Sequence, residues 1–223
     1  MKFSIWHLLL VTLIIAVVIA CSIEPRNRWE KMNVKDSLDR LTTAIRKHYP
    51  ERKLSPVVPM APAELARLEK QLPMAPRQLF ELFELYDFRR PNIFSSFTPI
   101  SPSDMQDSID GQIGFYEEYI GPLADNPWTS CNGDYCKLNM AWRKKWIPLG
   151  LDFGGDMFFI DMDPAEGGIA GQIVSTNEDG WYLTVHAYSL AHWMGRIAEN
   201  IENGRTRSGG YSCKVYGELP NPK

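Results

Sequence analysis

The chain has 223 residues, with 24 Lys and Arg against 27 Asp and Glu, and 44% of its residues are hydrophobic. This composition is ordinary for a folded domain and excludes wholesale disorder. The formal net charge of −3 argues against a dedicated nucleic-acid binder, which usually carries a basic stripe.

The N-terminal segment is the most apolar part of the sequence. Residues 5–23 contain no formally charged side chain. As a helix rising ~1.5 Å per residue they would extend roughly 28 Å, close to the hydrocarbon thickness of a bilayer. We therefore expect residues 1–23 to form a membrane anchor. More Lys and Arg residues follow this segment than precede it, which favours a single transmembrane helix with the soluble domain in the cytoplasm.

Other interpretations of the same segment stay open. The tetrapeptide Val18-Ile19-Ala20-Cys21 resembles a bacterial lipobox, in which Cys21 would be lipidated and the protein would be a lipoprotein of the cell envelope. Val18 and Ala20 also partly satisfy the small residues that precede a cleavage site. The segment could therefore be a cleaved signal peptide instead, or else a buried core helix.

Residues 24–61 are expected to form a juxtamembrane stalk. Apolar residues recur at helical spacing over residues 34–48, which predicts an amphipathic helix. Four prolines between positions 50 and 62 then exclude regular structure and indicate a semi-rigid spacer.

Residues 62–204 carry the pattern of an α+β domain. Helical spacing predicts short helices from Pro62 to Leu72, over 79–86 and over 101–120, and residues 121–141 are rich in loop-forming residues. Apolar runs within 144–150, 156–163, 171–175 and 180–188 then predict four consecutive antiparallel strands. A closing helix is expected from Ser189 to Gly204, and residues 205–223 form a tail with one more candidate strand. Helices would pack on one face of this sheet and leave the other partly exposed.

A block of spaced residues within 146–163 resembles the SUKH superfamily, which includes the yeast cell-wall assembly regulator and bacterial proteins of the Smi/Knr type. In that family a Trp-x-apolar-Pro-apolar-Gly turn precedes a Gly-Asp, a strand of large apolar residues and a strand-ending Asp. The matching residues, which the resemblance implies are structural, are Trp146, Pro148, Gly150, Gly154, Gly155, Asp156 and Asp161, with Trp193 in the final helix.

The resemblance implies a non-catalytic protein-interaction module. Bacterial members are often predicted immunity proteins that neutralise a partner toxin, and the fungal relative is a hub for cell-wall signalling. We therefore expect a membrane-anchored scaffold or immunity protein that is not an enzyme and presents the exposed side of its sheet to an unknown protein partner. The candidate contact residues are Trp128, Trp142, Asp152, Asp156 and Asp161.

Five acidic residues within 152–166 suggest an alternative, because hard cations prefer carboxylate oxygens. They are Asp152, Asp156, Asp161, Asp163 and Glu166. The alternative is a domain that senses a cation or a small ligand, although the spacing is not that of an EF-hand and Asp is also a common turn residue. A hydrolase is a further alternative, but no nucleophile elbow or phosphate-binding glycine motif accompanies the acids. The sequence therefore predicts no cofactor, no metal ion and no catalytic residue.

Cys131 and Cys136 flank the turn sequence Asn132-Gly133-Asp134, which could bring the two thiols together. A disulfide would imply an oxidising compartment and leave Cys213 unpaired, and a zinc site would lack a fourth ligand at recognisable spacing. The sequence leaves open whether these are ordinary buried cysteines or a disulfide.

Overall fold

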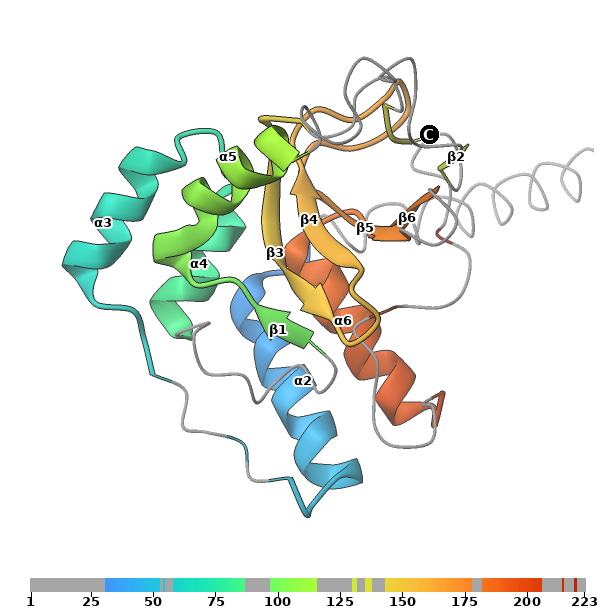
Figure 1. Cartoon of the computed structure of the whole chain (residues 1–223). Coiled ribbons are helices and arrows are strands. Elements are labelled where there is room, and N and C mark those ends of the chain that lie inside the picture. Colours follow the sequence, from blue (N-terminus) through green and yellow to red (C-terminus); the bar gives the residue numbers. More distant parts are fainter. Residues whose placement is uncertain are drawn as a thin grey trace, which may run out of the picture.

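The computed structural model describes residues 31–52, 54, 58–86, 97–115, 130–131, 135–137, 143–177, 182–205, 214 and 219. Within these ranges the chain has the predicted α+β organisation (Figure 1). Helices come first along the chain, the main strands follow, and one helix closes the described part.

The N-terminal helices lie close to where the apolar spacing predicts them. They are α2 (Val34–His48), α3 (Pro62–Gln71), α4 (Arg77–Leu85) and α5 (Met105–Phe115), the last preceded by the 3₁₀ turn η1 (Pro102–Asp104). Asn33 caps α2, because its side-chain oxygen accepts a hydrogen bond from the backbone N–H of Asp36. Pro62 occupies the first turn of α3, as expected for a residue that lacks an N–H.

Helix α2 packs into the hydrophobic core, although its sequence was assigned to a stalk. Figure 1 shows it beside the closing helix α6 (Leu190–Glu202). Its apolar face is buried among the core residues, and Arg40 forms an ion pair with Glu202 across the two helices. The core therefore extends beyond residues 62–204 and includes residues 34–48.

The central sheet has the strand order β1-β3-β4-β5-β6-β2. Its strands are β1 (Phe97–Pro99), β2 (Ser130–Cys131), β3 (Trp146–Asp152), β4 (Met157–Asp161), β5 (Gln172–Asn177) and β6 (Tyr182–Ala187). Strands β3 to β6 pair antiparallel in chain order, which confirms the predicted meander. The edge strands β1 and β2 were not predicted, because two or three residues are too few to show a period.

Both faces of the sheet are covered in the described part of the chain. On one face, Ile147, Phe158 and Ile160 pack with the helices into the main core. On the other, a second cluster is built from Trp146, Phe159, Val174, Leu183 and Val185 together with Met157, Cys131 and Cys136. Every residue of β4 is buried. The expectation of a partly exposed face is therefore wrong for this strand, because alternation shows which residues share a face and not whether another segment covers it.

None of the helices within the described ranges is both long and apolar enough to cross a bilayer. The predicted anchor over residues 1–23, with Cys21, lies outside the described residues. Trp128, Trp142 and most of the tail after Arg205 also lie outside them.

Candidate functional site

The turn between β3 and β4 is held by the side chain of Asp152. Its Oδ1 accepts hydrogen bonds from the backbone N–H groups of Gly154, at 2.8 Å, and Asp156, at 3.1 Å. Gly155 has φ of +87°, a conformation that side chains other than glycine rarely adopt. The Asp and Gly residues at this point therefore build a tight turn.

Lys214 places its ammonium between the two carboxylates of this turn. Its Nζ lies 2.9 Å from Asp152 Oδ2 and 2.5 Å from Asp156 Oδ2. Burial alone would disfavour the charged lysine, but the hydrogen bonds and negative charges of Asp156 and Asp152 outweigh it and raise the pKa of Lys214 above its ordinary value. A cation from the chain itself thus neutralises the pair that the sequence proposed for ligand or partner contact.

Phe153 projects from the tip of this hairpin. Its exposed fraction is 84%, far above the other large hydrophobic side chains that are exposed in the described part, which are Met74, Leu151 and Tyr182 at 38–40%. Leu151 lies two residues before it on β3. Phe153 was not among the residues predicted for partner contact. A signal was present in the sequence, because a large aromatic residue between Asp152 and two glycines occupies a turn position that is usually polar.

Asp161 lies at the other end of β4 and is fully buried. It accepts hydrogen bonds from Trp146 Nε1 at 3.1 Å, Gln172 Nε2 at 3.0 Å and the backbone N–H of Asp163 at 2.9 Å. Burial raises the pKa of Asp161, and these hydrogen bonds oppose the rise because they favour the charged form. Asp161 therefore holds buried donors together and presents no surface to a partner.

The remaining acidic residues do not gather around one point. Asp163 pairs with Lys137 at 2.7 Å and Arg143 at 3.1 Å, while Glu166 is exposed. The hydrogen bond from Lys137 lowers the pKa of Asp163. Among the described residues, no three His, Cys, Asp or Glu side chains lie close enough together to hold a metal ion.

Gly150 and Trp193 of the motif set fix the packing of the sheet against the helices. A Cβ atom at Gly150 would lie 2.4 Å from the carbonyl oxygen of Thr98 and 2.5 Å from the ring of Phe97. Only glycine therefore allows β1 to approach β3 this closely. Trp193 is fully buried and meets the ring of Phe97 edge-on, with 5.9 Å between centroids.

Of the two histidines in the C-terminal half, His186 is a core residue and His192 is half-buried. His186 is buried, contacts Ser175 Oγ through Nε2 at 2.8 Å and stacks on Phe158. Burial lowers the pKa of His192 to about 4, and its Nδ1 accepts a hydrogen bond from the backbone N–H of Tyr188.

The chain is similar to a known protein over one stretch of its length. No family model matches the chain. A stretch of 60 residues is 38% identical to a glucan synthesis regulatory protein of Neurospora crassa. This stretch is 27% of the present chain, and the match covers 11% of the length of that relative. The chain is thus similar over part of its length to a regulatory protein of glucan synthesis.

Proposed function

We propose that the chain is a non-catalytic protein-interaction module of the SUKH type, regulatory in role, which its N-terminal segment brings to a membrane. The order of the motif residues within 146–163 and the similarity to a glucan synthesis regulatory protein support the family assignment. The observation that carries the interaction role is the tip of the β3–β4 hairpin, where Phe153 is 84% exposed.

The hairpin is suited to hold an aromatic anchor in a fixed position. The hydrogen bonds of Asp152 and the ion pairs of Lys214 order the turn before any partner arrives. Less conformational entropy is then lost when Phe153 is buried by a partner. Large aromatic residues placed in this way often dominate an interface, and truncating one costs about 2 kcal/mol or more, which is roughly a 30-fold loss of affinity.

Photo-crosslinking from position 153 of the full chain in its own cells would identify the partner. Binding of the purified partner is then compared between wild type, Phe153→Ala and Met74→Ala. Met74 is the matched control, because it is an exposed apolar residue on the turn between α3 and α4. We expect Phe153→Ala to weaken binding roughly 30-fold and Met74→Ala to have little effect. Equal effects of the two substitutions, or no protein adduct at position 153, would refute the hairpin as the contact surface.

The identity of the crosslinked protein separates the two regulatory roles. A toxin whose activity the chain inhibits would establish an immunity protein. A component of glucan synthesis would establish a scaffold with a regulatory role like that named for the relative in Neurospora crassa.

Membrane attachment is tested with Cys21→Ala in the full chain. If the substitution abolishes membrane association, Cys21 carries a lipid anchor. If association persists, the apolar segment acts as a transmembrane helix. Recovery of a chain without a lipid that lacks residues 1–20 would show a cleaved signal peptide.

A further inference from the structure

Two cysteine side chains meet on the second face of the sheet. The Sγ atoms of Cys131 and Cys136 lie 2.7 Å apart, and the two residues are 5% and 4% exposed. No disulfide joins them in this structure. They belong to the cluster that covers Trp146 and Phe159.

The two thiols are positioned by separate parts of the fold. Cys131 is in β2, where it pairs with Leu183 of β6. Cys136 is fixed through its neighbour Tyr135, whose carbonyl oxygen accepts hydrogen bonds from Gln172 Nε2 at 3.0 Å and from the backbone N–H of Ala165 at 3.1 Å.

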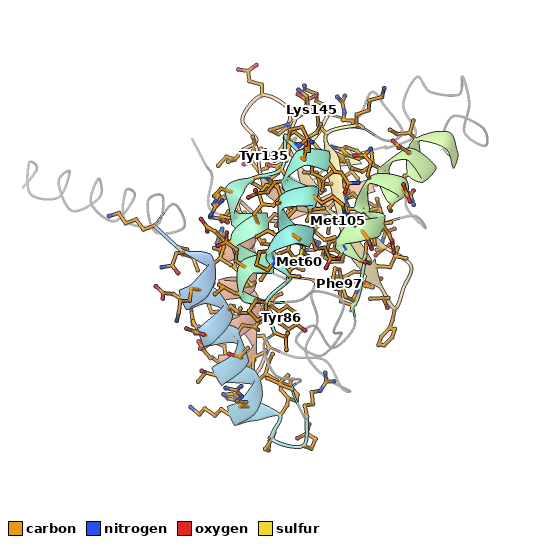
Figure 2. All side chains as sticks on the ribbon, turned by 90° about the vertical axis from the view of Figure 1, so that its left-hand side faces the viewer. Met60, Tyr86, Phe97, Met105, Tyr135 and Lys145 are labelled. Atoms are coloured by element: carbon orange, nitrogen blue, oxygen red, sulfur yellow. The ribbon has the colours of Figure 1, made fainter. Side chains whose placement is uncertain are left out.

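Figure 2 shows Tyr135 at the same end of the molecule as Lys145. The backbone carbonyl of Lys145 accepts a hydrogen bond from the N–H of Met162, just after β4. Because β6 on one side and the segment after β4 on the other supply the anchors, the fold brings the two thiols together without a covalent bond between them.

We propose that Cys131 and Cys136 are the site of an intrachain disulfide, formed by thiol–disulfide exchange with a small-molecule or protein disulfide. One cysteine thiolate attacks a sulfur of the donor, forms a mixed disulfide and releases the first donor thiol. The second cysteine thiolate then attacks the protein sulfur of that mixed disulfide and releases the second donor thiol. The two cysteines are oxidised by two electrons, the donor is reduced to two thiols, and these thiols take up the two protons of the cysteines.

The burial of the two thiols also determines when thiol–disulfide exchange is fast. The hydrogen bond with Cys131 and burial raise the pKa of Cys136, so its thiolate is scarce in the folded state. We therefore expect exchange to proceed during folding, before Cys131 and Cys136 are buried. In the folded protein, the burial of Cys131 and Cys136 would also shield the disulfide from external reductants.

The disulfide would fasten the edge strand β2 to the segment that covers the second face of the sheet. This inference is independent of the proposed interaction role. Because disulfides persist in oxidising compartments and are rare in reducing ones, the state of the pair in cells would also report on which side of a membrane the domain folds.

The test uses the full chain with Cys21→Ser and Cys213→Ser, which leaves only the proposed pair, kept in detergent because of its apolar N-terminal segment. The protein is refolded in a buffer of reduced and oxidised glutathione, quenched with acid, and alkylated with N-ethylmaleimide under denaturing conditions. Intact mass should show the loss of two hydrogen atoms and no alkylation, whereas a sample refolded with excess reductant should take up two adducts.

Single substitutions and protection from reduction complete the test. Cys131→Ser and Cys136→Ser, each in the same background, should leave one alkylatable thiol. The oxidised pair should resist dithiothreitol in the folded protein and be reduced at once in denaturant. Two free thiols after oxidative refolding, glutathione adducts on both cysteines, or a disulfide between two chains would overturn the proposal.

Discussion

Replacing Asp161 by alanine would remove the acceptor on which three hydrogen-bond donors converge. Two of the donors belong to Trp146 and Gln172, which are fully buried, and a buried donor left without an acceptor costs about 1–3 kcal/mol. The third, the backbone N–H of Asp163, is part-buried and can turn to water. Removing a buried carboxylate also relieves its desolvation, which offsets part of the loss. We therefore expect Asp161→Ala to lower the free energy of unfolding by about 2–4 kcal/mol.

The measurement is urea unfolding of the full chain at neutral pH, followed by far-UV circular dichroism. A lower midpoint at unchanged slope would report lost stability and not a changed unfolded state. Glu166→Ala is the matched control, because it removes an exposed carboxylate close by and should change stability by no more than about 0.5 kcal/mol. An Asp161→Ala protein as stable as wild type, or an equal loss in both variants, would refute the role given to this carboxylate.

The pH dependence of the same variant provides a second check. Burial raises the pKa of Asp161, so between the unfolded and folded pKa values the folded state binds more protons than the unfolded state. The contribution of Asp161 to stability is therefore full below the unfolded pKa and falls as pH rises through the folded pKa. The loss caused by Asp161→Ala should accordingly grow as the pH is lowered from neutral. A loss that shrinks on acidification would contradict this sign.

Three further predictions concern other described residues. Gly150→Ala should lower the free energy of unfolding by about 1–3 kcal/mol or more, seen as a lower melting temperature, because the new Cβ would overlap the carbonyl oxygen of Thr98. An unchanged melting temperature would mean that β1 shifts freely. Burial lowers the pKa of His192 to about 4, so this residue contributes stability above pH ~6.5 that is lost as the pH falls toward 4, by up to roughly 3 kcal/mol. The urea midpoint of His192→Gln should therefore fall less than that of wild type over this pH range. Parallel falls of the two midpoints would refute this. Lys214→Met should lower the free energy of unfolding by about 1 kcal/mol, seen as a lower urea midpoint, because the buried carboxylate of Asp156 loses its counter-charge. An unaltered midpoint would refute a stabilising role of this ion pair.

Much of the secondary structure could be predicted because local spacing determines it. The helix over 34–48 matches α2 at both ends, and the strand runs within 144–188 match the meander β3 to β6. Ser189 caps α6 as expected, with its side-chain oxygen accepting from the N–H of His192. These features follow from apolar periodicity and capping residues, which act over a few neighbouring positions.

The candidate site was only partly predictable for a related reason. The sequence grouped Trp146 and Asp161 in one motif, and in the structure Trp146 donates a hydrogen bond to Asp161 in the core. The five acidic residues are close together in the sequence. In the structure, Asp152 and Asp156 lie in the turn before β4, whereas Asp161 is the last residue of that strand. The partners that decide their roles come from distant positions, such as Lys214 for the turn and Gln172 for the core.

The sequence by itself determined the α+β class, the order of the elements and the residues that share a face, because these depend on short-range spacing. Only the tertiary structure decided that α2 joins the core, that the second face of the sheet is covered, and that Phe153 stands exposed on an ordered turn. The charge composition does not show that Lys214 neutralises Asp152 and Asp156. Nor does it show that Asp161 is buried. Burial and pairing are set by contacts between segments far apart in the chain, and a single sequence does not show these contacts.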